Sequence, residues 1–292
     1  MKRSILIFFF LTLFLFPACK SEKQEASAPP PESQQATSGL ELFPSDATRE
    51  AAFYLKSQTI DLSKAKVQWF INDKIVEGAA SPQLKSSEIK KRDIIYAKVL
   101  AGNQEILSNR IEIRNIPPVI ASIKINPSRP KVNDILKADV TANDRDGDNV
   151  TFLYEWTNNG DSAGNGETLE GPFKRGDKIS LKITPYDEED YGQTVVPSTI
   201  IYNASPKVTG GGAEKFENNV YIYQIYASDP DGDELVYSLI QAPEGMVIDP
   251  KTGLIRWKTQ ENDSGRHAVS VKVSDGQGGD ILYNFDITIG FK

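Results

Sequence analysis

Apolar and polar side chains alternate along most of the chain from about Gly39 onward. The alternating positions are Leu136, Ala138 and Val140; Val150, Phe152, Tyr154 and Trp156; Val220, Ile222, Gln224 and Tyr226; and Leu235, Tyr237 and Leu239. A period of two is typical of a β-strand that buries one face. No long segment with the period of an amphipathic helix appears in this part of the sequence. The pattern therefore predicts an all-β protein.

Two segments of the chain repeat one pattern. The matching stretches are 67–72 with 154–159, 91–99 with 175–183, and 110–115 with 198–203. Each copy closes on an asparagine, Asn115 or Asn203, and a proline follows shortly after it. Repetition of this kind indicates two homologous units of roughly 80–90 residues, each forming one structural repeat.

The repeat resembles a known class of domain. Trp69 and Trp156 each lie in what would be the third strand, with alternating strands on either side. The spacing of this tryptophan, a (Lys/Arg)-x-Asp turn and the closing Asn-x-x-Pro resembles the PKD-like and other bacterial immunoglobulin (Ig)-like repeats of exported proteins. The resemblance implies that both tryptophans belong to sandwich cores, the alternative being exposed aromatic binding platforms.

The last unit, 204–292, follows a different pattern. Asp229-Pro230-Asp231-Gly232-Asp233 leads into a strand, and Thr252-Gly253-Leu254-Ile255-Arg256-Trp257 and Val273-Ser274-Asp275-Gly276 follow. This order is similar to dystroglycan-type cadherin-like and Ig-like repeats of bacterial surface proteins. The similarity implies a third β-sandwich but no particular function. The predicted divisions are a lipoprotein signal peptide at 1–18, a lipidated cysteine and disordered tether at 19–38, Ig-like domain 1 at 39–115, Ig-like (PKD-like) domain 2 at 116–203, and cadherin-like domain 3 at 204–292.

A short acidic loop occurs twice, at 144–148 and 229–233, and each copy places three aspartates at alternate positions. Crowded carboxylates repel one another unless a cation neutralises them, and Ca²⁺ prefers oxygen ligands. In an Ig-like sandwich the loops after the second and sixth strands lie at one end, so acids from both would meet. The candidate calcium ligands are Asp144, Asp146, Asp148 and Asp187 in one unit and Asp229, Asp231, Asp233 and Asp275 in the next.

Two observations limit the calcium hypothesis. Cadherins place Asp-x-Asp in this same loop after calcium-filled joints, but the joints here, 113–117 and 201–206, contain no acid. The glycine stands fourth in each loop, which excludes an EF-hand, where it stands sixth. The alternative is a solvated hairpin turn, for which Asp-Gly is a common choice. The first unit lacks the loop altogether, with Asp61 as the sole acid between residues 57 and 65.

The N-terminus has the pattern of an export signal. Lys2 and Arg3 precede an apolar run over 5–16 that is too short to span a membrane, and Cys19 is the only cysteine. Residues 15–19 resemble the lipobox of bacterial lipoproteins. The resemblance implies that Cys19 carries diacylglycerol and an N-acyl chain such as palmitate, and the following Lys20 favours the outer membrane, on its periplasmic face or at the cell surface. The alternative is an ordinary secreted protein with a chance cysteine at the cleavage site.

Composition mainly narrows the classes of partner and activity that are expected. Loss of the signal with Lys2 and Arg3 moves the formal net charge from −7 to −9, which disfavours nucleic acid as a partner. The polar, proline-containing stretch 20–38 predicts a disordered tether. The single histidine, His267, is in phase with Val269, Val271 and Val273 and is expected to pack at the start of a strand. No nucleophile or phosphate-loop motif appears, so an enzyme is not expected.

The sequence thus predicts a membrane-anchored, non-enzymatic binding, adhesion or assembly module of three tandem sandwiches, with calcium as a candidate stabiliser. A protein or glycan partner is expected, with its identity open. The alternatives are a glycan-binding or accessory lipoprotein of an export or fibre machine and, more remotely, a carboxylate-based hydrolase.

Overall fold

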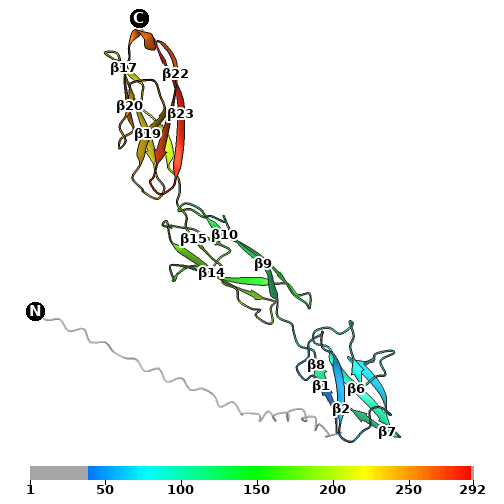
Figure 1. Ribbon diagram of the computed structural model, residues 1–292. Helices are drawn as coiled ribbons and strands as arrows, with labels where there is room; N and C mark the ends of the chain where they lie inside the picture. Colours follow the sequence, from blue (N-terminus) through cyan, green and yellow to red (C-terminus); the bar gives the residue numbers. More distant parts are fainter. Residues whose placement is uncertain (1–38, 291–292) are drawn as a thin grey trace, which may run out of the picture.

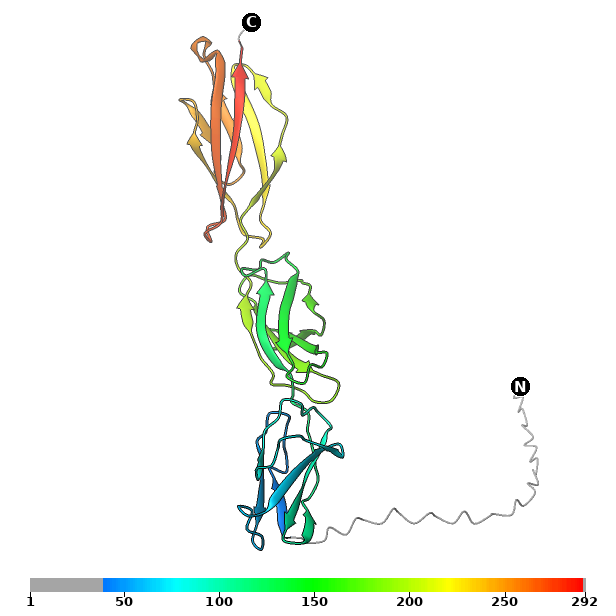
Figure 2. The ribbon, with the colours of Figure 1, turned by 90° about the vertical axis from the view of Figure 1, so that its right-hand side faces the viewer.

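The computed structural model describes residues 39–290, so the predictions for the signal peptide, Cys19 and the tether lie outside the described residues. Three β-sandwiches lie end to end in an elongated array (Figures 1 and 2). The prediction of an all-β protein is confirmed, because the described chain contains a single turn of 3₁₀-helix, η1 (Glu261–Asp263), beside its strands. Within residues 39–290 no helix has the length and apolar character needed to cross a membrane.

The first sandwich consists of two antiparallel sheets. One has the order β1-β2-β5, and the other has the order β4-β3-β6-β7 with β8 also paired to β6. The strands are β1 (Leu40–Phe43), β2 (Phe53–Ser57), β3 (Lys66–Ile71), β4 (Lys74–Ile75), β5 (Gln83–Leu84), β6 (Ile94–Ala101), β7 (Gln104–Leu107) and β8 (Ile111–Glu112). The inner faces of the two sheets enclose one apolar core.

The second sandwich repeats this plan with the orders β13-β10-β9 and β12-β11-β14-β15. The strands are β9 (Val119–Asn126), β10 (Leu136–Asn143), β11 (Thr151–Asn158), β12 (Asp161–Gly164), β13 (Thr168–Leu169), β14 (Lys178–Tyr186) and β15 (Ser198–Ile200). Along β11 the alternation follows the prediction: Trp156 is 1% exposed, whereas Leu153 faces outward at 50%. Ala204 closes this second core, one residue beyond the predicted end of the domain.

The third sandwich pairs β16-β18-β21-β20, with β17 also on β18, against β19-β22-β23. The strands are β16 (Lys207–Gly211), β17 (Lys215–Glu217), β18 (Val220–Ser228), β19 (Val236–Gln241), β20 (Met246–Ile248), β21 (Leu254–Lys258), β22 (Gly265–Ser274) and β23 (Asp280–Ile289). The predicted face of β18 is wrong. Tyr221, Tyr223 and Ile225 are buried instead of the even-numbered positions. Both faces of residues 220–226 carry mainly apolar or aromatic side chains, and packing against the sheet that contains β22 selects one.

Each sandwich has its own hydrophobic core, and each core is centred on a tryptophan. Trp69, Trp156 and Trp257 are 0–1% exposed, and each indole Nε1 donates a hydrogen bond of 2.8–3.0 Å to a backbone carbonyl. The prediction that Trp69 and Trp156 are core residues is therefore confirmed. His267 also behaves as expected: its ring packs edge-on against Trp257 at 4.8 Å, at the start of β22.

Candidate metal centres at the joints between the sandwiches

The predicted acids come together at the end of each sandwich that faces its predecessor. Carboxylate oxygens of Asp144, Asp148 and Asp187 lie within 4.8 Å of one another, and Asp229, Asp233 and Asp275 form the same group one sandwich further on. We call these, together with the residues of the joint beside them, the first and second acidic clusters. Asp146 and Asp231 lie in the same loops, but each also contacts the backbone of the joint.

The loop after the second strand of each sandwich is organised by its first aspartate. Asp144 Oδ1 accepts hydrogen bonds from the backbone N–H groups of Asp146 at 2.8 Å and Asp148 at 3.1 Å. Asp229 binds the corresponding two N–H groups of its loop at 2.8 and 3.4 Å. The glycine in each loop has φ of +87° or +83°, a conformation that few other residues adopt readily, which explains its fixed fourth place. The side chains of the alternate aspartates thus converge on one side.

The second loop contributes one deeply buried carboxylate per cluster. Asp187 is 3% exposed and Asp275 4% exposed. Burial alone would raise the pKa of Asp187, but hydrogen bonds from Asp190 N–H, the Asn115 amide and Glu189 N–H outweigh burial and lower it. Asp275 has its pKa lowered in the same way, against burial, by Asn203 and two backbone N–H groups. Both carboxylates are therefore held ionised at neutral pH.

The preceding sandwich completes each cluster through its closing asparagine. Asn115 Nδ2 donates to Asp187 Oδ2 at 2.8 Å and to Asp190 Oδ2 at 3.0 Å, and the N–H of Ile116 donates to Asp146 at 2.7 Å. The second joint repeats this arrangement, with Asn203 donating to Asp275 at 2.7 Å and Ala204 N–H to Asp231 at 2.6 Å. The joints contain no acid, as the sequence shows, yet they supply an amide and a backbone N–H to the acids beyond them.

In the sequence both asparagines are recognisable only as repeat boundaries, so these contacts were not predicted. The signal that could have found them is the repeat itself, because each asparagine lies 72 residues before its buried aspartate.

Several oxygen atoms in these clusters are buried without a hydrogen-bond partner. They are Asn115 Oδ1, Asp144 Oδ2 and Asp146 Oδ1 at the first joint, and Asp229 Oδ2 and Asp231 Oδ1 at the second. An unpaired buried carboxylate oxygen is costly, and a cation removes that cost. Carboxylate and amide oxygens are the ligands that Ca²⁺ prefers, so the residues present fit this ion.

A basic side chain of the preceding sandwich also reaches each cluster. Lys91 forms ion pairs with Asp148 and with Glu189. Arg175, at the matching position of the repeat, pairs with Asp233. The hydrogen bond to Asp148 raises the pKa of Lys91, and that to Asp233 raises the pKa of Arg175, so both stay charged. These side chains supply part of the positive charge that the clusters require.

One glycine in the second loop of each cluster packs directly against the joint. A Cβ added to Gly192 would lie 1.9 Å from Pro118 O, and one added to Gly279 would lie 2.0 Å from Asp275 Oδ2 and 2.9 Å from Asn203 Nδ2. Only glycine permits these close approaches without movement of the loop.

Among the described residues, the corresponding loop of the first sandwich forms no comparable cluster. Asp61, the acid of the corresponding loop, hydrogen-bonds Ser63 and pairs with Lys64 at 3.2 Å within an exposed turn. This contact is local and brings no second loop to it.

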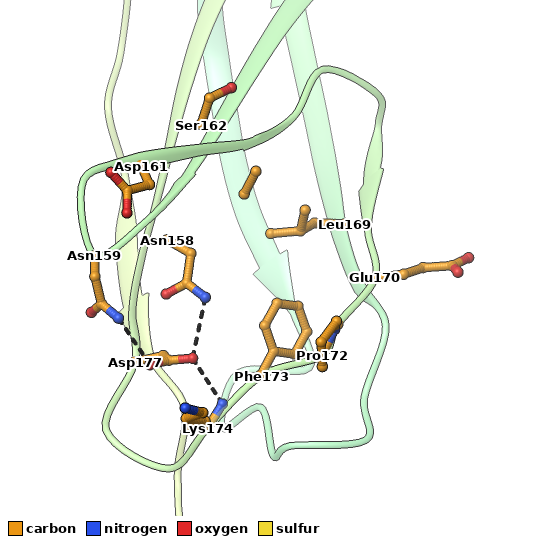
Figure 3. Close-up of a pocket in the computed structure, with 12 residues that line it drawn as sticks. Asn158, Asn159, Asp161, Ser162, Leu169, Glu170, Pro172, Phe173, Lys174 and Asp177 are labelled. Carbon is orange, nitrogen blue, oxygen red and sulfur yellow. Dashed lines mark hydrogen bonds between the residues drawn. The ribbon is translucent and has the colours of Figure 1, made fainter.

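A cavity of about 530 Å³ lies on the second sandwich (Figure 3). Its polar end is Asp177, which accepts hydrogen bonds from Asn158 and Asn159 and from the backbone N–H of Lys174. The first sandwich contains the matching pair, with an Asn72 to Asp93 bond of 2.6 Å. Asp177 therefore fixes a turn that the repeat shares, and we assign the cavity no ligand.

Comparisons with known proteins agree with this architecture. Residues 197–290 match the family model described as "Putative Ig domain". A comparison with curated protein sequences gives no match.

Similar solved structures include the N-terminal eight Ig domains of Down Syndrome Cell Adhesion Molecule, with 8% identity, 86% of this chain and 36% of that chain covered, and a TM-score of 0.41. Drosophila OTK extracellular domains 3–5 align with 12% identity, 86% and 97% coverage and a TM-score of 0.33. Protocadherin Gamma B2 cadherin domains 3–6 align with 11% identity, 87% and 76% coverage and a TM-score of 0.27. The chain spans about a third of the first of these structures. At such identities and TM-scores the likeness carries no conclusion about this chain.

Proposed function

We propose that the protein is a membrane-anchored, non-enzymatic adhesion or assembly module whose Ig-like sandwiches are held in line by calcium at the two joints. The observation that carries the calcium part is the presence of buried, unpartnered oxygens in two equivalent acidic clusters, each completed by the preceding sandwich. The candidate ligands are Asp144, Asp146, Asp148 and Asp187 at the first joint and Asp229, Asp231, Asp233 and Asp275 at the second. Calcium at these positions would join two sandwiches rather than stabilise one alone.

The adhesion or assembly role is supported by the shape of the molecule. An elongated array presents a large surface and spans distance. The anchor is the lipidated Cys19, and the proposed place is the outer membrane, on either of its faces. The proposed partner is a protein or a glycan, and nucleic acid is not expected because the chain is acidic.

Thermal unfolding of the chain in EDTA, Ca²⁺ or Mg²⁺ at fixed ionic strength tests the calcium function. With millimolar Ca²⁺ and a Kd near 10⁻⁴ M, binding to the folded state adds roughly 1.4 kcal/mol per site. That increment raises the melting temperature of a sandwich by several degrees, and Mg²⁺ substitutes poorly because it demands a smaller, stricter shell. Asp231→Asn removes most of the increment of the third sandwich, whereas Asp61→Asn, in the equivalent loop of the first, leaves it unchanged. Identical melts in all three solutions would refute the calcium function.

Acyl labelling and membrane partition test the anchor. Cys19→Ser abolishes labelling and releases the protein into the periplasm or the medium. Unchanged partition and labelling would contradict the lipoprotein assignment.

Glycan binding is the second candidate, and one observation favours it. Tyr186 and Tyr191 stack with ring centroids 4.5 Å apart, and Tyr191 is 59% exposed beside the second loop of the second sandwich. Exposed aromatic rings are suited to stacking against sugars through their apolar faces. If the wild type is retained by a glycan matrix and Tyr191→Ala abolishes this retention at unchanged stability, the result supports this candidate. Absence of retention of the wild type would exclude it.

A further inference from the structure

The two joints differ in how their basic side chain meets the acids. At the first joint Lys91 Nζ contacts one oxygen of Asp148 and lies 3.0 Å from Glu189 Oε2. Its charge is thus divided between the cluster and an acid at the edge of the cluster. Asn115 Oδ1 stays without a partner although the residue is only 7% exposed. The amide oxygen of this joint is therefore available to a cation.

At the second joint the basic side chain occupies those same groups. The guanidinium of Arg175 pairs with both oxygens of Asp233, through Nη1 and, at 3.0 Å, through Nη2. Its Nη1 also donates to Asn203 Oδ1 at 2.7 Å. A planar guanidinium binds a carboxylate in this two-point manner more firmly than an ammonium does. A metal that uses Asp233 and the Asn203 oxygen has to displace Arg175 first.

The charge of the two clusters differs in the same direction. The second loop of the first cluster contains Glu189 and Asp190 after Asp187, whereas Gln277 and Gly278 stand at these places after Asp275. Arg92 of the first sandwich pairs with Glu189 at 3.0 Å and offsets one of these two acids. The other, Asp190, leaves the first joint the more negative of the two, and attraction for a divalent cation grows with that charge.

From these differences we propose that the two joints bind calcium with unequal affinity, the first more tightly, because Arg175 competes with the metal at the second. The inference rests on the proposed calcium function and adds to it an order of loading. As the calcium concentration rises, the joint between the first and second sandwiches binds calcium before the joint between the second and third. Arg175 is thus a built-in competitor that sets the calcium concentration at which the second joint loads.

Calorimetric titration of the full chain with Ca²⁺ tests the order. Two binding events are expected, separated by on the order of tenfold in Kd, the scale of one charge-assisted contact. Asp144→Asn removes the tighter event, and Asp229→Asn removes the weaker one. These two variants assign each event to a joint independently of Arg175.

Variants at the competitor test its role. Arg175→Gln moves the weaker event to about tenfold tighter binding, and Arg175→Lys, which copies the ammonium of Lys91, gives a smaller shift. Lys182→Gln is the matched control, because Lys182 belongs to the same sandwich but pairs with Glu155 at 2.7 Å instead of contacting the joint. It leaves both events in place. Unfolding in EDTA verifies that each variant is folded.

The outcomes separate the two proposals. If Arg175→Gln still shows two calcium-binding events and the Kd of the weaker one is unchanged, the proposed competition is wrong but the calcium function stands. Loss of the tighter event in Asp229→Asn rather than Asp144→Asn would overturn the order. Absence of any binding by the wild-type chain would overturn the calcium function and this inference with it.

Discussion

The interiors of the sandwiches and the joints between them are built in opposite ways. Each interior surrounds a buried tryptophan whose only polar atom, Nε1, is hydrogen-bonded to the backbone. The joints, by contrast, gather carboxylates and an amide. Within residues 39–290, five of the seven buried side-chain atoms that lack a hydrogen-bond partner lie at the joints. The interiors thus consist mainly of apolar side chains, whereas the joints leave buried oxygen atoms without a hydrogen-bond partner.

This difference divides the stability of the molecule into two parts. Burial of apolar surface stabilises each sandwich whatever ions are present. The energy of the joints depends on charge, so it responds to metal, to pH and to ionic strength. The array is expected to lose its alignment under conditions that leave the individual sandwiches folded.

Trp156→Ala tests the interior and has the largest expected effect. Removing a ring that is 1% exposed leaves a cavity and costs about 3–5 kcal/mol, which is comparable with the whole stability of an ordinary domain. Denaturant unfolding measures the loss, which is the same in EDTA and in Ca²⁺. Leu153→Ala, on the outer face of the same strand, is the control and changes stability by less than about 0.5 kcal/mol. A calcium-dependent loss in Trp156→Ala would contradict the separation of interior and joint.

The interiors were predictable from the sequence and the joints only in part. A period of two and a tryptophan in the third strand are local signals, so Trp69 and Trp156 were assigned correctly. The predicted face of β18 failed because Tyr221 and Tyr223 stand on one face and Tyr226 on the other, so no local signal distinguishes the two faces. The general arrangement of acids at one end followed from strand order, and the structure brings Asp187 and Asp275 to the predicted loops.

What the sequence did not reveal is the contribution of the preceding sandwich. Lys91 contacts Asp148 across 57 residues, and Arg175 contacts Asp233 across 58. Such contacts depend on how two folded units meet end to end, which no strand period encodes. The nearly equal spacing of the two pairs becomes meaningful only when the repeat is aligned with itself.

Gly279→Ala tests the joint through its packing. The new Cβ would overlap Asp275 Oδ2 and approach Asn203 Nδ2 and Ser205 Cα, both 2.9 Å away. The loop has to move, and overpacking of this kind costs about 1–3 kcal/mol. The calcium increment of the third sandwich falls as well, because the moved loop carries Asp275. Gly290→Ala, where no atom lies within 4 Å of the added Cβ, is the control in the same sandwich. Equal melting temperatures and equal calcium increments for the two variants would show that the joint does not depend on the close packing of Gly279.

Acid tests the joint through its charge and has the smallest expected effect. The folded state lowers the pKa of Asp187 and Asp275, so each carboxylate binds protons more readily in the unfolded chain. Their contribution to stability is therefore fully present above the unfolded value of about 3.9 and is lost as pH falls through the lower folded pKa. Between neutral pH and about pH 5 the contribution stays constant.

Denaturant unfolding between pH 7 and pH 2.5, in EDTA to exclude metal, measures this loss. Asp187→Asn keeps an amide oxygen in place of the carboxylate and makes the acid limb of the stability curve shallower. Asp161→Asn, at an exposed acid of the same sandwich, gives the same stability curve as the wild type. In Ca²⁺ the acid limb of the wild type becomes steeper, because protons and metal compete for the same oxygens. An acid limb that neither Asp187→Asn nor calcium changes would show that the joints add no titratable stability, and that the interiors alone account for the folding energy of the array.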